Sequence, residues 1–298
     1  KSANDKKKLD SYEYEVYNKL QFDLNNLSEE FSNRKFIKKM KILDRYLDST
    51  NGKKILPVLL AESISDIYYN KKLNKKKEII KANRVTGIEN LNLEQFTGEM
   101  YQDVNVYENN LNLFNKHFIS PISDFGKQHY KYYLDDSLTL EGHWCYYIRF
   151  VPKRTGQPCF IGEMWIADTS YALKKIKANI PPDINLNFVG NVEIEQNYEE
   201  VEPEVWMMTH EKLLADLEIY ENTKLFGLFA HKTTSRKNFK INQPKERKFY
   251  IEGLDVEVSD SAKTQSDDYW NTARHDTLNQ QESGIIGMVD TVKQNPTF

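Results

Sequence analysis

Long apolar runs are missing from this sequence. No stretch approaches the roughly 20 apolar residues that a membrane-spanning helix needs, and the first residues, Lys1 to Asp10, are charged and unlike the apolar region of a signal peptide. We therefore expect a soluble chain. Its abrupt start and its end at Phe298, just after a predicted helix, favour a segment cut from a longer protein.

An excess of positive charge is also missing. The formal net charge is -3, from 41 Lys and Arg against 44 Asp and Glu. A chain with this balance has no global positive field that would hold a polyanion by counterion release. We therefore expect no nucleic acid among its partners.

Cysteine is scarce: the chain has only Cys145 and Cys159. If residues 154–157 form a hairpin turn, Val151 lies opposite Cys159, and Cys145 lies opposite a residue near Trp165. Each residue advances a strand by about 3.3 Å, so the two sulfurs are too far apart for a disulfide. The pattern predicts two free thiols.

Aromatic residues, by contrast, are abundant, with 18 Tyr, 15 Phe and 4 Trp, and hydrophobic residues make up 39% of the chain. This composition is too apolar for disorder and favours strands. Alternation predicts strands at 12–24, 55–69, 79–85, 125–134, 144–151, 159–167, 171–180, 192–201, 205–220 and 228–241, with turns at 71–77, 135–136, 141–142, 154–158, 168–169 and 202–204. Sequential hairpins imply an antiparallel sheet.

Helices are predicted in two places within the first hundred residues and at the C-terminus. Ser28 is a candidate N-cap for a helix whose apolar stripe includes Phe36, Met40, Leu43 and Leu47, and Asn92 to Met100 resembles a helix that starts with a capping box. From about Asp255 the composition indicates a linker, followed by helices at 267–278 and 281–293. We expect this tail to dock loosely or to belong to something absent.

The predicted strands 144–151 and 159–167 carry an apolar face, with Arg149 and Glu163 together on the opposite face. That apolar face is formed by Trp144, Tyr146, Ile148, Phe150, Phe160, Met164 and Ile166. Covered by helices, it is an ordinary core. If the sheet curves strongly and the cover is partial, the same residues line an apolar cavity and contact a ligand. The pattern does not separate the two cases.

No motif for catalysis or metal binding is complete. His210-Glu211 resembles the start of a zinc-protease motif, but position 214 is Leu where the second His belongs, so a solvated strand pair is the better interpretation. His143, Cys145 and Cys159 are metal-ligand types that the hairpin register keeps apart, so packed side chains are favoured. We predict no catalytic residue, no metal and no cofactor.

Two charged clusters also favour simple explanations. Lysines at 71, 72, 75, 76, 77 and 81 would suit anionic lipid headgroups, but an exposed hairpin tip is the favoured interpretation. Glutamates between 193 and 204 alternate with apolar residues, which favours a solvated strand face over a calcium site.

Several stretches resemble a family of uncharacterised Bacteroidetes envelope proteins. They are the run from Ile55 to Tyr69, Phe118-Ile-Ser-Pro-Ile-Ser123, Trp144-Cys-Tyr, Phe160-Ile-Gly-Glu-Met-Trp-Ile-Ala-Asp168, Asn187-Phe-Val and Tyr269-Trp-Asn-Thr-Ala-Arg274. In that family a carboxypeptidase-regulatory-like domain precedes this region and a predicted outer-membrane barrel follows it. The resemblance implies a location at the periplasmic face of the outer membrane and lends no catalytic residues.

A second, remoter resemblance is to the lipoprotein-carrier superfamily. A strand with Phe-x-Gly-x-Met-Trp-Ile, a turn, then Tyr-x-Leu-x-x-Ile is similar to its pattern over residues 12–241. This resemblance implies a curved antiparallel sheet with helices plugging it, which holds acyl chains.

These observations lead to an α+β, β-dominated fold: an incomplete antiparallel barrel over residues 1–254 with two plugging helices, then a linker and short helices at 255–298 leading to a membrane barrel. The leading functional hypothesis is a non-catalytic periplasmic module that holds a lipid, acyl chain or lipoprotein. The alternative is a structural domain that docks envelope proteins, including its own membrane barrel, without a small ligand. The third is a hydrolase that uses His210 or His143.

Overall fold

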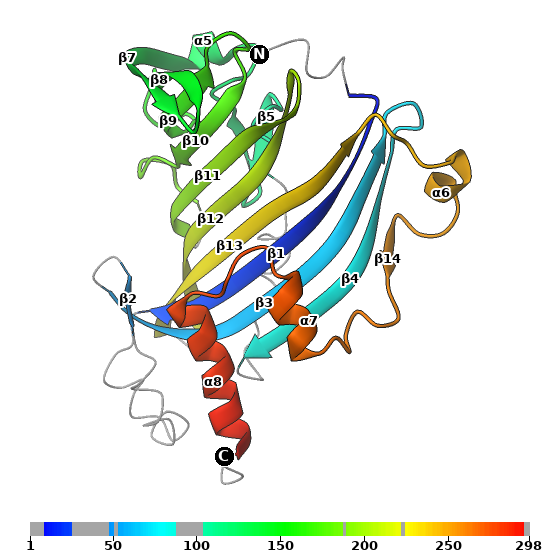
Figure 1. The fold of residues 1–298 in the computed structure, drawn as a ribbon. Coiled ribbons are helices and arrows are strands. Elements are labelled where there is room, and N and C mark those ends of the chain that lie inside the picture. Colours follow the sequence, from blue (N-terminus) through cyan, green and yellow to red (C-terminus); the bar gives the residue numbers. More distant parts are fainter. Residues whose placement is uncertain are drawn as a thin grey trace.

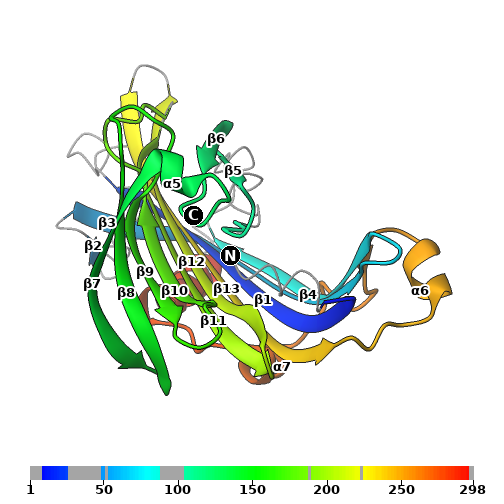
Figure 2. The same ribbon diagram turned by 90° about the horizontal axis from the view of Figure 1, so that it is seen from above.

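A large curved antiparallel sheet dominates the chain (Figures 1 and 2). The computed structural model describes residues 9–25, 48–50, 53–87, 104–186, 189–221 and 224–294. Within these residues the predicted β-dominated, incomplete barrel with a helical C-terminal tail is confirmed. The two helices predicted before residue 101 lie outside the described residues.

The strands of the main sheet cross it in the order β14-β4-β3-β1-β13-β12-β11-β10-β9-β8-β7, and β2 pairs with β3 beside this path. Their bounds are β1 Ser11–Asn25, β2 Asp48–Thr50, β3 Lys53–Asn70, β4 Lys75–Gly87, β7 Tyr130–Leu140, β8 His143–Pro152, β9 Ile161–Ala167, β10 Leu173–Asn179, β11 Val189–Glu202, β12 Val205–Glu221, β13 Lys224–Ile241 and β14 Val256–Val258. The predicted hairpins are present, and β1 lies between the β3–β4 hairpin and the β7 to β13 meander. Because β7 and β14 are opposite edges of the sheet, the barrel stays open.

Turn residues set most of the hairpins. Glu141 and Gly142 both have positive φ, 47° and 83°, as the predicted two-residue hairpin requires. The turn predicted at Asp135-Asp136 is wrong, because β7 continues through these residues with a register shift. Such a bulge keeps the strand paired while its Asp135 carboxylate forms an ion pair with Arg149 at 2.9 Å.

The register of β8 and β9 places Arg149 opposite Glu163, as predicted. Cys145 lies opposite Ala167, two residues from the predicted partner. Both cysteines are free and buried, in agreement with the prediction of two free thiols. The predicted strand from Phe125 begins instead as a short helix, α5 (Gly126–His129).

Two smaller groups of elements flank the sheet on opposite sides. Inside the curve lies a hairpin of β5 (Asn110–Leu113) and β6 (Lys116–Ile119), and outside it lies α7 (Asp267–Ala273) (Figure 2). The remaining helices are α6 (Arg247–Ile251) and α8 (Gln280–Gln294), which contacts β3 and β4. No helix of the described chain is long and apolar enough to cross a membrane.

The tail is attached more firmly than the sequence indicates. Part of the predicted linker forms β14, which pairs with β4 in parallel. Trp270 of α7 is 1% exposed and packs with Tyr17, Ile64 and Ala82 on the outer face of the sheet. The expectation of a loosely docked tail is therefore wrong, because a buried tryptophan anchors it.

Candidate functional site

The concave face of the sheet contains a cavity of about 710 Å³ at β13, β1, β3 and β4. Its lining comprises Tyr14, Val16, Asn18, Ala61, Glu62, Ser63, Ile67, Lys76, Glu78, Ile80, Asn83, Arg84, Val85, Lys232, Arg236, Lys263, Gln265 and Trp270. Lys263 and Gln265 belong to the segment that runs beside β4, where Asn83 N–H donates to the Ala262 carbonyl. We call the concave face of these four strands the open half.

A row of polar residues crosses the concave face at right angles to the strands. Residues directly opposite one another in paired strands share a face of the sheet. The strand registers align Gln196, Glu211, Thr234, Asn18, Ser63 and Asn83, one residue from each of six neighbouring strands. We call this set the polar row; its last three members line the cavity.

Hydrogen bonding differs between the two ends of the polar row. At the β11–β12 end, Gln196 Nε2 donates to Glu211 at 2.7 Å, and Lys232 Nζ lies 2.9 Å from the same carboxylate. Thr234 donates to Asn18 at 2.8 Å. At this buried end of the polar row, the side chains are therefore paired with one another by hydrogen bonds.

At the β4 end the polar row faces the cavity. The side chains of Ser63 and Asn83 are half-buried and make no hydrogen bond within the part of the chain that the structure describes. These two side chains are positioned to contact a molecule in the cavity.

Apolar rows flank the polar row in the open half. On one side the registers align Val16, Ser65, Ile80 and Val258 across the sheet, a row that is apolar except for the buried Ser65, and on the other they align Leu20, Ala61 and Val85. Val85 is 71% exposed and Val258 is 53% exposed. Apolar surface therefore continues from the cavity to the open edge of the sheet.

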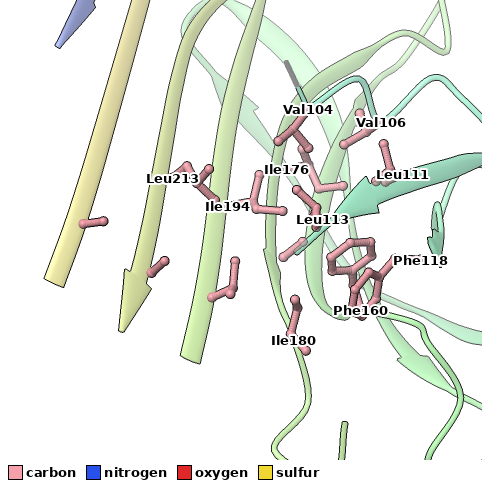
Figure 3. Close-up of a cluster of buried hydrophobic side chains, with 14 of the residues drawn as sticks. Val104, Val106, Leu111, Leu113, Phe118, Phe160, Ile176, Ile180, Ile194 and Leu213 are labelled. Atoms are coloured by element: carbon pink, nitrogen blue, oxygen red, sulfur yellow. The ribbon is translucent and has the colours of Figure 1, made fainter. Parts of the chain in front are cut away.

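The concave face of β7 to β12, which we call the filled half, is packed by the chain itself. The β5–β6 hairpin and the residues before it lie against this face (Figure 3). Phe118 is fully buried, and its ring centroid lies 5.0 Å from that of Phe160. Leu111 and Leu113 belong to the same cluster as Ile194. This half is a protein core.

A charged cluster braces the open half from the outer face. Glu62 accepts hydrogen bonds from Tyr17 at 2.7 Å, from Arg274 at 2.7 and 3.0 Å, and from Arg84 at 3.1 Å. The guanidinium groups of Arg84 and Arg274 lie 5.1 and 5.8 Å from the Trp270 ring centroid. The α7 helix is therefore held by apolar burial and by charge together.

The environment of Glu62 fixes its protonation. Burial opposes ionisation of this carboxyl group, but the hydrogen bonds from Arg274, Tyr17 and Arg84 outweigh burial and hold its pKa below the usual 4.5. A second contact, the 2.7 Å ion pair between Lys19 and Glu282, joins α8 to β1, with both side chains buried. Asn279 and Glu282 form a capping box at the start of α8.

The seven residues predicted to line a ligand lie in and around the filled half. Phe150, Phe160 and Met164 are buried in its core, and Ile148 and Ile166 pack against that core. Trp144 is 52% exposed, and the half-buried Tyr146 donates to Asp168 at 2.7 Å. None of the seven lines the cavity of the open half, and their role as ligand contacts stays a prediction.

The histidines and cysteines considered for catalysis or metal binding make packing and hydrogen-bond contacts with neighbouring side chains. The His143 ring lies edge-on to Trp206 with centroids 4.9 Å apart, and His210 contacts the neighbouring Thr209 hydroxyl at 3.3 Å. Burial raises the pKa of the Cys145 and Cys159 thiols, which keeps them protonated near neutral pH. Among the described residues, no group of three or more potential ligands is placed to hold a metal ion.

Sequence reasoning missed two charged residues that the fold buries. Glu211 was interpreted as half of a solvated pair, yet it is 1% exposed, because its strand position faces the concave side next to Lys232. Lys77, assigned to an exposed loop, is also buried, with Glu257 at 2.8 Å. The one available signal was the alternation of β12, which puts Glu211 on the same face as Leu213.

Fold and cavity define an open antiparallel half-barrel with a partly filled concave face. A model of the family of unknown function DUF5686 matches residues 1–236, and the chain belongs to this family. No curated protein matches the sequence.

Several solved structures are similar to this chain. A DUF1329 family protein from Desulfovibrio piger has 11% identity over 84% of this chain and 94% of its own, with a TM-score of 0.33. A domain described as an outer-membrane lipoprotein-sorting protein, from Vibrio parahaemolyticus, has 8% identity, coverage of 79% and 89%, and a TM-score of 0.27. A LolA superfamily protein from Nitrosomonas europaea has 7% identity, coverage of 82% and 91%, and a TM-score of 0.25. TM-scores of this size carry no argument about function.

Proposed function

We propose that this chain is a non-catalytic binding module that holds the apolar part of a lipid, acyl chain or lipoprotein in the open half. The observation that carries the proposal is the cavity of about 710 Å³, which lies within the range of roughly 300–1,000 Å³ typical of ligand sites. The apolar rows that flank the polar row provide the contact surface.

The contrast with the filled half supports this proposal. There the chain supplies its own apolar cover in the β5–β6 hairpin, whereas Val85 and Val258 leave apolar side chains exposed at the edge of the open half. Exposed apolar surface beside a cavity is a common mark of a binding site. By the resemblance stated above, we place the module at the periplasmic face of the outer membrane.

The proposal is tested by blocking the cavity. Val85→Trp adds a large side chain at the cavity wall, and it should weaken binding of a lipophilic fluorescent probe by about tenfold, the effect of losing about 1.4 kcal/mol of contact. Leu134→Trp is the matched control, because Leu134 is 67% exposed on β7 and does not line the cavity. Equal binding by both variants and the unmodified chain would count against the open half as the site.

Protein docking without a small ligand is the second candidate. It is favoured by the exposure of Tyr133 (43%), Leu134 (67%) and Trp144 (52%) at the β7 edge. If pull-downs from envelope extracts lose a specific partner on Leu134→Lys substitution while probe binding is absent, this candidate replaces the first. A hydrolase remains the third; alanine substitution of His143 or His210 should abolish any hydrolysis that is detected.

A further inference from the structure

Three uncharged polar side chains meet at the end of the polar row that lines the cavity. Asn18, Ser63 and Asn83 lie directly opposite one another on β1, β3 and β4. Neighbouring strands of a sheet are about 4.8 Å apart, so the three side chains span about 10 Å across the strands. We call these three residues the uncharged strip.

The uncharged strip has unused hydrogen-bonding capacity. The Asn18 Oδ1 atom accepts a hydrogen bond from the Thr234 hydroxyl at 2.8 Å. The Asn18 amide nitrogen, the Ser63 hydroxyl and the whole Asn83 amide form no hydrogen bond within the part of the chain that the structure describes. Two residues further along β3, the Ser65 hydroxyl is 1% exposed and has no partner among the described residues. Because polar groups removed from water are normally satisfied, these groups are suited to bonding with a molecule in the cavity.

Most cations that line the cavity interact with other groups of the chain. Arg84 pairs with Glu62 at 3.1 Å, and Lys232 pairs with the buried Glu211 at 2.9 Å. Two further cations of the lining also interact within the chain, Lys76 and Arg236. An anionic head group would compete with these contacts, whereas the uncharged strip is available without such competition.

The type of head group follows from the donors and acceptors of the uncharged strip. An amide side chain has two donors and an acceptor oxygen, and a hydroxyl both donates and accepts. A carboxylate head only accepts, so it would leave the acceptor oxygens of Ser63 and Asn83 unsatisfied. An ammonium head only donates, so it would leave the amide N–H groups unsatisfied. A glycerol ester has hydroxyl donors and a carbonyl acceptor in one head, and it can satisfy both kinds of group.

We propose that the open half selects amphiphiles with an uncharged head that both donates and accepts hydrogen bonds, the head of a glycerol ester. The head contacts the uncharged strip. The apolar chain follows Val16 and Ile80 toward Val258 at the sheet edge. This inference rests on the proposed binding function and adds the chemistry of the head group to it.

Three probes of one chain length test the proposal: monodecanoylglycerol, decanol and decanoate, each displacing a lipophilic fluorescent probe from the full chain. Monodecanoylglycerol should bind about tenfold more tightly than decanol, because its head can form several hydrogen bonds with the uncharged strip. Decanoate should bind no more tightly than decanol. The quantity measured is the dissociation constant of each probe.

Asn83→Leu should reduce the binding of monodecanoylglycerol to the level of decanol, because leucine has a similar volume and no amide. Asn179→Leu is the matched control, since Asn179 is exposed on β10 and does not line this cavity. Ser63→Ala removes a single hydroxyl from the uncharged strip. It should reduce the preference in the same direction, and it serves as the test if Asn83→Leu does not fold.

The outcomes separate this inference from the function beneath it. Equal binding of monodecanoylglycerol and decanol to the unmodified chain, or tightest binding of decanoate, overturns the head-group inference and leaves the binding function intact. Binding of none of the three probes overturns the proposed function itself. A preference that survives in Asn83→Leu and Ser63→Ala, or that is lost in Asn179→Leu, would also overturn the inference.

Discussion

The two halves of the concave face share one sheet and one alternation of side chains, yet they differ in what covers them. The filled half packs against the β5–β6 hairpin, with Phe118 fully buried against Phe160. The open half keeps a cavity lined by Val16, Ile80 and Val85. A strand pattern therefore establishes that a face is apolar, while the elements opposite that face decide whether it becomes a core or a binding surface.

The two halves are also separated by charge. The buried Glu211–Lys232 pair, at 2.9 Å, lies where β12 meets β13, and Gln196 bonds to the same carboxylate. On the outer face, the open half is braced by α7 through Glu62 and Trp270, and by α8 through the Lys19–Glu282 pair. The open half has fewer apolar contacts on its concave face, and packing on its outer face can hold the sheet in shape instead.

The largest loss of unfolding free energy is expected from a substitution in the core of the filled half. Phe118→Ala should destabilise the chain by about 3–5 kcal/mol, because it leaves a cavity in a packed core. Ile80→Ala in the open half should cost about 1 kcal/mol, because that half-buried side chain is already partly in contact with solvent. Chemical denaturation measures the unfolding free energy of both variants. Equal losses in the two variants would contradict the distinction between a packed filled half and an open half.

The second-largest loss of unfolding free energy is expected at the charged cluster around Glu62, which braces the outer face. Glu62→Gln should cost about 3 kcal/mol, since it leaves Arg274 and Arg84 without their buried charge partner. Glu252→Gln, in an exposed pair with Lys248, is the control and should change the unfolding free energy by less than about 0.5 kcal/mol. If both variants unfold at the same denaturant concentration, the cluster around Glu62 does not brace the sheet.

Acid should weaken the same brace. In the folded chain the pKa values of Glu62 and Glu15 lie below the usual 4.5; burial opposes ionisation in both, and hydrogen bonds from Arg274 and from Lys81, respectively, outweigh it. A lowered folded pKa gives stability that is present above the unfolded pKa and is lost as pH falls through the folded pKa. The unfolding free energy should therefore decrease on acidification below about pH 5, less steeply in Glu62→Gln. A pH-independent free energy over that range would contradict this assignment.

The smallest effect on stability is expected at the cavity wall. Val85→Trp should change the unfolding free energy by less than about 0.5 kcal/mol, because Val85 is 71% exposed. Thermal unfolding measures this change beside the probe titration. A large destabilisation would mean that the cavity wall is part of the core and that any loss of binding reflects unfolding.

Alternation in the sequence predicted most of this sheet. It located the β8–β9 register at Arg149 and Glu163, and composition located the helices that contain Trp270 and Glu282. It misplaced the turn at Asp135, where a bulge leaves no signal in the alternation.

The sequence could not predict the candidate site, because its residues come from strands that are far apart along the chain. The polar row takes one residue from each of six strands, and β1 and β13 meet although more than 200 positions separate Asn18 from Thr234. Only the pairing of β1 with β13 places these residues side by side. Aromatic content directed the prediction toward the β8–β9 face, which the β5–β6 hairpin fills.

The central claim, that the open half holds an apolar ligand, is tested most directly by native mass spectrometry of the purified chain, followed by organic extraction. The account predicts a stoichiometric lipid or acyl species on the unmodified chain and on Leu134→Trp, and its loss from Val85→Trp. The unmodified chain at its bare mass, with no probe amphiphile retained after addition, would contradict the claim and favour a docking role.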